Sequence, residues 1–154
     1  MDRVTAAIAL GSNLGDRRAH LNHAIARLRD LLAHLRISRF HETVPVGTRG
    51  SQPLYLNAVA VGDAAMPPRE LLDALLAIEA GRGRERPYAN SPRTLDLDLI
   101  LYGDAVIDAP GLVVPHPRFR DRRFVLEPLA EIAPDMKDPV TAKTASELLK
   151  RLDG

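Results

Sequence analysis

The stretch Leu95-Asp96-Leu97-Asp98-Leu99-Ile100-Leu101-Tyr102 alternates leucine with aspartate and then becomes wholly apolar. This pattern predicts a β-strand, because successive side chains of a strand point to opposite faces of its sheet. The leucines would lie on a buried face, and both carboxylates would lie on the other. The strand therefore predicts a packed sheet that carries Asp96 and Asp98 side by side.

Further strands are expected upstream of this one. Apolar runs and period-two alternation indicate them at 3–10, 37–43 and 55–61. Two segments rich in glycine, proline or charge, 44–53 and 83–92, interrupt the regular patterns and are expected to be exposed loops. Downstream, the turn residues Gly103-Asp104 predict a hairpin whose short second strand covers 105–108.

Helices are expected between and after the strands. Leucine and isoleucine recur every three or four residues from the N-cap Asp16 to about Leu35. A second helix begins at Pro67-Pro68 and ends before Gly81. Two more are predicted at 122–132 and 145–152, the last with Thr144 and Glu147 as a capping box.

The order β-α-β-β-α-β favours the α+β class. The 154 residues, 45% of them hydrophobic, suit one domain with a packed core, so we expect a single domain over residues 1–154. The absence of cysteine excludes a disulfide scaffold, a thiolate metal site and a cysteine nucleophile, and it fits the cytoplasm. We expect no signal peptide, and no apolar run is long enough for a membrane span.

Arginine is unevenly distributed in a chain whose net charge is only +1. One cluster comprises Arg82, Arg84, Arg86 and Arg93, and another comprises Arg118, Arg120, Arg122 and Arg123. Local basic patches on a nearly neutral protein favour a compact anionic ligand over a nucleic acid.

The aspartate pair is the strongest chemical signal. Carboxylates two residues apart on a strand can converge on one cation or hold a pair of cations, and hard oxygen ligands favour Mg²⁺. An amphipathic strand with a solvated acidic face would show the same alternation. Arg93 and the preceding loop arginines add groups that match phosphate geometry, although each alone is compatible with an ordinary charged surface.

A flat ligand is suggested by Tyr55, Asn57 and Phe124, because aromatic residues make up only 4% of the chain. Rings can stack on a heteroaromatic ligand while an amide bonds its polar edge. Each of the three is also compatible with a core or capping role. Gly11-Ser12-Asn13 lacks the lysine of a phosphate-binding P-loop and favours a strand-to-helix turn with a role at the site.

Several motifs occur together in one order. They are Gly11-Ser12-Asn13-Leu14-Gly15, Thr43-Val44-Pro45-Val46-Gly47, Gln52-Pro53-Leu54-Tyr55-Leu56-Asn57-Ala58, Ile78-Glu79, Gly83-Arg84, Pro92-Arg93-Thr94-Leu95-Asp96-Leu97-Asp98-Leu99, Val114-Pro115-His116-Pro117, Arg122 and Phe124-Val125-Leu126-Glu127-Pro128-Leu129. This set, spanning about residues 8–134, resembles the 6-hydroxymethyl-7,8-dihydropterin pyrophosphokinase family. The resemblance implies a ferredoxin-like α+β domain, mainly antiparallel, with helices on both faces of the sheet. It also implies a monomer that moves pyrophosphate from ATP to a pterin alcohol in folate biosynthesis.

The same resemblance implies residue roles. Asp96 and Asp98 would bind two Mg²⁺ ions, and Asp98 is the candidate to accept the hydroxyl proton. The pterin would contact Thr43, Val44, Val46, Tyr55, Asn57 and Phe124. Arg84 and Arg93 would act in catalysis, and they would bind ATP together with Glu79, Leu99, His116 and Arg122.

Two other functions stay open on the residues alone. A nucleotidyltransferase shares the Gly-Ser and Asp-x-Asp motifs, but here Ser12 and Asp96 are more than 80 positions apart instead of in one short unit. A non-catalytic ferredoxin-like module that binds RNA or a small effector would need no metal, and the scarcity of aromatic residues disfavours RNA.

Overall fold

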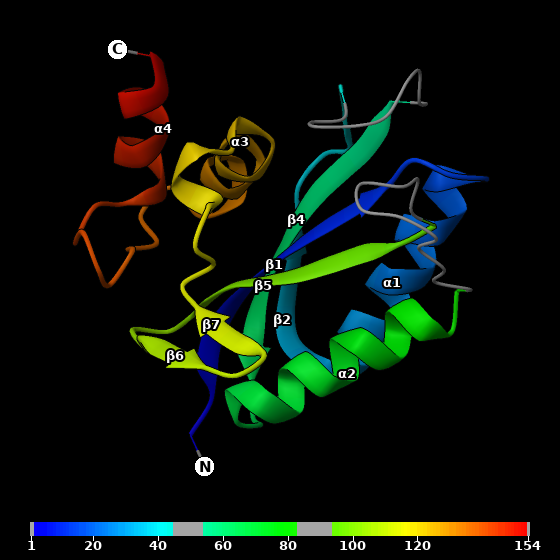
Figure 1. The fold of residues 1–154 in the computed structure, drawn as a ribbon, viewed down its shortest axis with the longest axis horizontal. Coiled ribbons are helices and arrows are strands. Elements are labelled where there is room, and N and C mark those ends of the chain that lie inside the picture. Colours follow the sequence, from blue (N-terminus) through cyan, green and yellow to red (C-terminus); the bar gives the residue numbers. More distant parts are fainter. Residues whose placement is uncertain (1, 45–53, 83–93, 154) are drawn as a thin grey trace.

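The structure, a computed structural model, describes residues 2–44, 54–82 and 94–153. Its centre is a five-stranded sheet with helices on both faces (Figure 1). The strands are β1 (Val4–Ser12), β2 (Leu32–Ile37), β3 (His41–Thr43), β4 (Tyr55–Ala64) and β5 (Asp96–Tyr102). Their order is β2-β4-β1-β5, with β3 paired to β4 beyond the end of β2, and every pair is antiparallel. The α+β, ferredoxin-like class is therefore confirmed.

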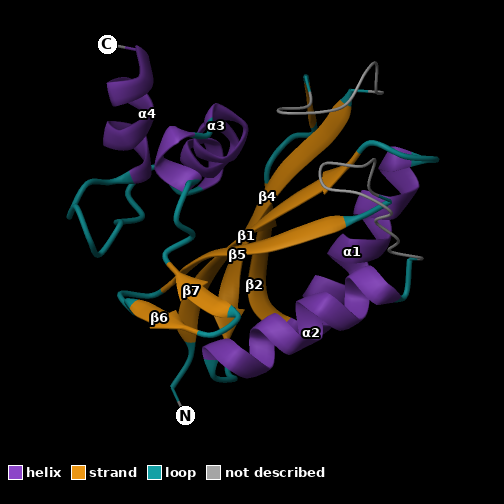
Figure 2. Ribbon diagram, in the orientation of Figure 1, coloured by secondary structure: helices purple, strands orange, loops and turns teal. Residues whose placement is uncertain are grey.

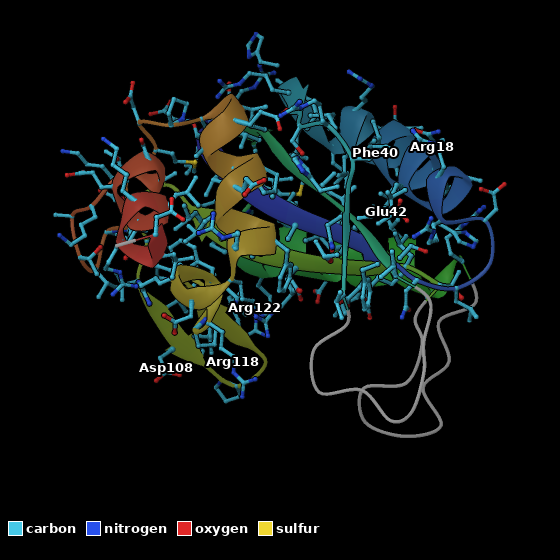
Figure 3. All side chains as sticks on the ribbon, turned by 90° about the horizontal axis from the view of Figure 1, so that it is seen from above. Arg18, Phe40, Glu42, Asp108, Arg118 and Arg122 are labelled. Carbon is cyan, nitrogen blue, oxygen red and sulfur yellow. The ribbon has the colours of Figure 1, made fainter. Side chains whose placement is uncertain are left out.

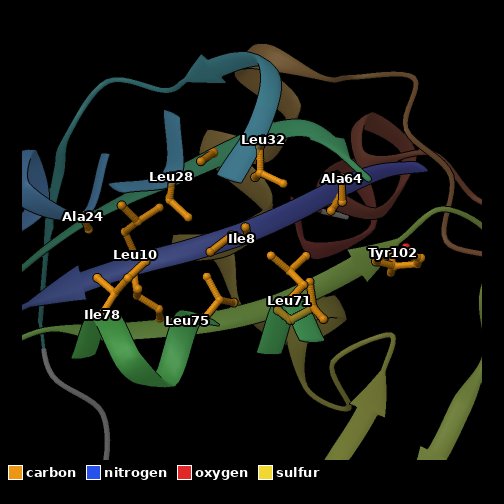
Figure 4. Close-up of a cluster of buried hydrophobic side chains, with 14 of the residues drawn as sticks. Ile8, Leu10, Ala24, Leu28, Leu32, Ala64, Leu71, Leu75, Ile78 and Tyr102 are labelled. Carbon is orange, nitrogen blue, oxygen red and sulfur yellow. The ribbon is translucent and has the colours of Figure 1, made fainter. Parts of the chain in front are cut away.

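Two helices cover one face of the sheet, as the colouring by secondary structure makes clear (Figure 2). They are α1 (Arg17–Leu31) and α2 (Pro68–Ala80). Their leucines pack on Ile8 and Leu10 of β1 and on the leucines of β5, which form the first apolar core (Figure 4). Leu97 and Leu99 both belong to this core, as the alternation in their strand predicts.

The opposite face is covered at one end by α3 (Arg123–Ile132) and α4 (Ala145–Asp153). Val59 and Val61 of β4 and Ile100 of β5 meet Val125 and Leu129 of α3 in the second apolar core. A 3-10 turn, η1 (Phe119–Asp121), leads into α3 and buries Phe119 completely. The rest of this face, toward the start of β4 and β5, carries polar residues instead.

The predicted end of the first helix is wrong. α1 begins after its N-cap Asp16, as expected, but it ends at Leu31, and the next residues form β2. β2 passes so close to Gly62 of β4 that a Cβ there would lie 2.9 Å from the Leu32 Cβ. Leu32 and Leu35 still face the first core, so their spacing satisfies a strand as well as a helix.

Two other strand predictions also need correction. The strand expected at 37–43 is divided between β2 and β3. The chain does turn at Gly103, whose φ is +54°, but the segment after it does not return along β5. Instead β6 (Ile107–Ala109) pairs with β7 (Leu112–Val114) in a separate two-stranded sheet.

The other helix boundaries agree with the sequence patterns. Gly81 is the C-cap of α2, and the capping box of α4 is formed by Thr144 and Glu147, with bonds of 2.9 and 3.2 Å between backbone and side chain. The predicted loop 83–92, and all but Val44 of the loop 44–53, lie outside the described residues. No helix in the described ranges has the length and apolar character needed to cross a bilayer.

Candidate active site

The uncovered end of the sheet brings together residues from three strands. Gly11 of β1 lies opposite Asn57 of β4 on one side and Asp96 of β5 on the other. Directly opposed residues share a face, so Asn57, Gly11 and Asp96 form one row across the sheet. Asp98, opposite Ala9, lies on the same face one step further along β5. The prediction that both carboxylates share a face is confirmed.

This row forms the floor of a cavity of about 770 Å³. Its lining comes from β1, β3, β4, β5 and the segment from Arg118 to Pro128, and comprises Ala9, Leu10, Gly11, His41, Glu42, Thr43, Val44, Tyr55, Asn57, Asp96, Asp98, Arg118, Asp121, Arg122, Arg123, Phe124, Glu127 and Pro128. Residues far apart in sequence therefore line one cavity. A volume of this size suits an organic ligand of moderate size.

One end of the cavity has aromatic and amide character. Tyr55 contributes from β4 and Phe124 from α3, so the two rings come from different layers of the fold. Between these elements the Asn57 amide, 6% exposed, donates a hydrogen bond from Nδ2 to Thr43 Oγ1. That bond fixes which way the amide faces, so its oxygen is held in one place for a ligand.

Gly11 allows the close approach of this amide. A Cβ at Gly11 would lie 3.1 Å from Asn57 Oδ1 and 3.5 Å from a ring carbon of Tyr55. Gly11 and Ser12, predicted to lie in a turn, are the last two residues of β1, and Gly11 lines the cavity; a role of this segment at the site stays a prediction.

The rest of the cavity lining combines the two carboxylates with arginine side chains. Arg118 and Arg122 both line it and lie close to each other (Figure 3). The Arg122 guanidinium lies 5.4 Å from the centre of the Phe124 ring, which is cation–π distance. Arginine side chains of this kind bind phosphate groups in bidentate fashion.

His116 lies beside these groups without lining the cavity. Burial and the nearby charge of Arg122 lower the pKa of His116 to about 4, although Asp96 acts to raise it. The ring is therefore neutral at pH 7. Its Nδ1 accepts a hydrogen bond of 3.1 Å from the Arg118 backbone N–H, which leaves the proton on Nε2 and makes that nitrogen a donor.

Among the described residues, only the second arginine cluster contributes to the cavity. Arg82, the one described member of the first cluster, bonds His20 Nδ1 at 2.9–3.1 Å, and neither residue lines the cavity. In the second cluster, Arg120 forms an ion pair with the buried Asp138, and Arg123 pairs with Asp153 and Glu127. Arg118 and Arg122 have no ion pair with a carboxylate of the described residues, so their charge is available to a ligand.

The carboxylate pair fits a magnesium site that is completed by its ligand. Asp96 and Asp98 are half-buried on one strand face and line the same cavity. No group of three or more His, Cys, Asp or Glu side chains in the described ranges could hold a metal ion. Mg²⁺ is usually bound by one or two carboxylates together with water and phosphate oxygens, so two carboxylates beside phosphate-binding arginines are an adequate protein contribution.

The structure does not bring every predicted site residue to the cavity. Glu79 is buried, and its Oε2 accepts a hydrogen bond of 2.6 Å from Leu97 N–H, between the two aspartates. Leu99 belongs to the first core. Arg84, Arg93 and Val46 lie outside the described residues.

Some lining residues were not expected from the sequence. Arg118, which lines the cavity, was indicated only as a member of the second arginine cluster. Glu127 belonged to a quoted motif but was given no role, and nothing in the sequence marked His41 or Asp121, because a single polar residue does not reveal which cavity it will face.

The sequence is similar to a defined set of known proteins. It matches the family described as 7,8-dihydro-6-hydroxymethylpterin-pyrophosphokinase (HPPK) over residues 7–134. It is 43% identical over 149 residues to the 2-amino-4-hydroxy-6-hydroxymethyldihydropteridine pyrophosphokinase of Synechocystis sp., covering 96% of this chain and 76% of that protein. The enzyme of the same name from Bacillus subtilis is 41% identical over 145 residues, covering 92% of this chain and 86% of that protein.

The fold also matches solved structures of more distant sequence. A crystal structure of HPPK-DHPS in complex with substrates superposes with a TM-score of 0.79 at 13% identity, covering 98% of this chain and 43% of that one. Wild-type HPPK-DHPS of Plasmodium falciparum gives a TM-score of 0.75 at 14% identity, covering 97% of this chain and 44% of that one. The chain thus spans less than half the length of these solved chains. On its sequence match from residue 7 to 134, it belongs to the 7,8-dihydro-6-hydroxymethylpterin-pyrophosphokinase family.

Proposed function

We propose that this chain transfers the pyrophosphoryl group of ATP to the hydroxymethyl group of 6-hydroxymethyl-7,8-dihydropterin and releases AMP, a step of folate biosynthesis. One observation carries the proposal: in a member of this family, a carboxylate pair and a fixed asparagine amide lie together on the floor of one cavity. The carboxylates suit a metal–phosphate group, and the amide with its flanking rings suits a flat heterocycle.

The acceptor site lies at the end of the cavity formed by β3, β4 and α3. Tyr55 and Phe124 hold the pterin ring between them, and Asn57 bonds its polar edge. The hydrogen bond from Asn57 to Thr43 prevents the amide from flipping, so the ring is accepted in one orientation. Val44 lines the same end, and Val46 is assigned to it from the resemblance alone.

The donor site lies at the β5 end. Asp96 and Asp98 would hold two Mg²⁺ ions, and this metal would supply neutralisation of the phosphate charge and polarisation of the phosphoryl oxygens. Arg122 and the neutral His116 lie on the nucleotide side, where the first supplies charge and the second a hydrogen-bond donor. Arg84, Arg93, Glu79 and Leu99 remain predicted nucleotide contacts from the resemblance.

The transfer itself asks little covalent chemistry of the protein. The hydroxymethyl oxygen attacks the β-phosphorus in line, the bond between that phosphorus and the α–β bridging oxygen breaks, and AMP leaves with that oxygen. Asp98 accepts the proton that the hydroxyl group loses. Positioning of the two substrates and neutralisation of charge supply most of the rate enhancement.

The test is formation of AMP from ATP, Mg²⁺ and the dihydropterin alcohol by wild-type protein and by Asp96→Asn and Asp98→Asn. Each substitution keeps the shape and removes the charge, so AMP formation should fall about 100-fold or more. Asp108→Asn is the matched control, because Asp108 is an exposed aspartate on β6 and does not line the cavity.

The alternatives predict other results. Release of pyrophosphate instead of AMP would identify a nucleotidyltransferase. ATP binding that is independent of Mg²⁺ and equal in all variants would favour a non-catalytic module. A monomeric state and a cytoplasmic location stay predictions, to be checked by light scattering and by cell fractionation.

A further inference from the structure

The strand that carries Thr43 is weakly held by the sheet itself. β3 has three residues, and it pairs with Tyr55–Asn57 of β4 as an edge strand. None of its three residues is buried or belongs to either apolar core. Edge strands without apolar packing depend on side-chain contacts to stay in register.

On the cavity face, α3 provides such a contact through Glu131. His41 lies opposite Asn57 and therefore shares its face. His41 Nε2 lies 3.2 Å from Glu131 Oε1, and the Arg39 backbone N–H donates to Glu131 Oε2 at 2.7 Å. Burial acts to raise the pKa of Glu131, but these bonds outweigh it and lower the pKa, so the carboxylate is ionised at neutral pH.

On the opposite face, the first turn of α1 provides a second contact. Arg17 Nη1 lies 3.0 Å from Glu42 Oε2 and donates to the Leu54 carbonyl at 2.8 Å. The same guanidinium thus joins β3 to the residue that precedes β4. A second cavity of about 480 Å³ adjoins this ion pair and is lined by Arg17, Glu42 and Phe40 among others. Because open space lies beside Arg17 and Glu42, we expect the ion pair, and not apolar packing, to fix this side of β3.

We propose that Glu131 and Arg17 are positioning residues that hold β3 from opposite faces of the sheet and thereby set the Thr43–Asn57 pair for pterin recognition. The four side chains Glu131, His41, Glu42 and Arg17 are called the β3 clamp. The inference rests on the proposed function, since it takes Thr43 and Asn57 as pterin contacts.

The β3 clamp should act on one substrate only. Neither Glu131 nor Arg17 lines the catalytic cavity, so their effect on the ring must pass through β3 and β4. β1 and β4 lie between β3 and the carboxylates of β5, and both are bonded along most of their length. Nucleotide binding at β5 should therefore be insensitive to the clamp.

The experiment compares Glu131→Gln and Arg17→Met with wild type. In Glu131→Gln, one of the two oxygens that accept bonds from Arg39 N–H and His41 is replaced by an NH₂ group, which donates. In Arg17→Met, the aliphatic part of the side chain is kept, but the guanidinium that contacts Glu42 and the Leu54 carbonyl is lost. Calorimetry gives the Kd of the dihydropterin alcohol without turnover, and AMP formation gives KM for each substrate. We expect the pterin Kd and KM to rise about three- to tenfold in each variant, with the KM for ATP unchanged.

Asp63→Asn is the matched control for Glu131→Gln. Asp63 is also a carboxylate that bonds a histidine, His34, at 3.0 Å and a second donor, Thr5 Oγ1, at 3.0 Å, but it lies at the far end of β4. Equal losses of thermal stability in Asp63→Asn and Glu131→Gln, with weaker pterin binding only in the latter, would support a positioning role. Asn57→Ala serves as the positive control for loss of pterin binding.

The outcomes separate the two proposals. Pterin Kd values in Glu131→Gln and Arg17→Met equal to that of wild type would overturn the β3 clamp, as would equal rises in the KM values for both substrates. A pterin Kd unchanged in Asn57→Ala would overturn it as well. Absence of AMP with wild-type protein would instead refute the proposed function, and the calorimetric test of the clamp would still be decided.

Discussion

Gly11 shows how a missing side chain can shape a binding site. It stands in the centre of the row that joins Asn57 to Asp96, where a Cβ would meet the asparagine amide oxygen at 3.1 Å. Asn57 is bonded to Thr43 and is almost fully buried, so it has little room to give way. The shape of the cavity beside Asn57 therefore depends partly on the absence of a side chain at Gly11.

We expect Gly11→Ala to raise the KM for the pterin about tenfold, because overpacking of a fixed group costs on the order of 1–3 kcal/mol. The KM for ATP should change little. Gly81→Ala is the control, since its added Cβ would meet its nearest atoms at 3.5 Å, an ordinary contact. An unchanged pterin KM in Gly11→Ala would mean that the Asn57 amide moves freely.

The lowered pKa of His116 predicts how the stability of the fold changes with pH. Its pKa falls from 6.5 to about 4 through burial and the charge of Arg122, so between these values the unfolded chain takes up a proton that the folded chain refuses. Stability should therefore decrease as the pH is lowered from 6.5 toward 4. Above pH 6.5 the group makes no contribution, because it is neutral in both states.

Thermal unfolding of His116→Gln between pH 7 and 4 checks this, and its Tm should fall less steeply than that of wild type. His20 also has a lowered pKa, caused by burial and by Arg82, and contributes with the same sign. His20→Gln separates the two contributions. Parallel Tm curves for wild type and His116→Gln would contradict the prediction.

At the same scale, the sequence singled out residues of distinctive chemical type, several of which the structure brings to one cavity. Two aspartates on one strand face, the aromatic residues Tyr55 and Phe124, and the arginine clusters all stand out by composition or spacing. The clustering of arginines alone does not separate Arg122, which the family resemblance singled out, from Arg120, because the ion pair of Arg120 with Asp138 depends on the fold of a segment 18 positions away.

Among the elements, the segment between α3 and α4 is organised around one buried carboxylate. Asp138 accepts hydrogen bonds from Arg120 Nε at 2.5 Å, from Thr141 Oγ1 at 2.7 Å and from Val140 N–H at 3.0 Å. Burial acts to raise its pKa, but the bonds from Arg120 and Thr141 outweigh it and lower the pKa to about 2. This carboxylate ties η1, and with it the approach to Arg122, to the C-terminal layer.

We expect Asp138→Asn to lower the free energy of unfolding by about 3 kcal/mol at pH 7, because it leaves the Arg120 charge without its partner. Urea denaturation measures the change. Asp121→Asn is the control: its side chain is 82% exposed and pairs with Arg151 at 3.7 Å, so the loss should stay below about 0.5 kcal/mol. Similar losses of unfolding free energy in both variants would show that the pair of Arg120 with Asp138 stabilises the fold no more than an exposed ion pair does.

Element boundaries were harder to predict than element types. Leucine spacing continued past Leu31 because Leu32 and Leu35 face the same core from a strand. The close contact between β2 and Gly62 requires a strand at Leu32. This contact joins residues about 30 positions apart, so the sequence around Leu32 does not reveal it.

Across the whole molecule, the two faces of one sheet have different tasks. Both faces carry an apolar core, but α3 and α4 cover only one end of their face. The row of Asn57, Gly11 and Asp96 begins where this helical cover ends. Local patterns predicted the α+β class, since alternation and helical spacing are visible within about ten or fifteen residues. They did not predict that Asn57 and Asp96 would flank Gly11, because this depends on the antiparallel register of three strands.

That register also fixes a distance across the cavity floor. Neighbouring strands are about 4.8 Å apart, so Asn57 and Asp96, two strands apart, have backbones separated by about 9.6 Å. Hydrogen bonding between the strands sets this separation, so substitutions of side chains leave it unchanged as long as the register is kept. Substitutions among the lining side chains would change which groups face the cavity, whereas the distance between the backbones of Asn57 and Asp96 is inherited with the sheet.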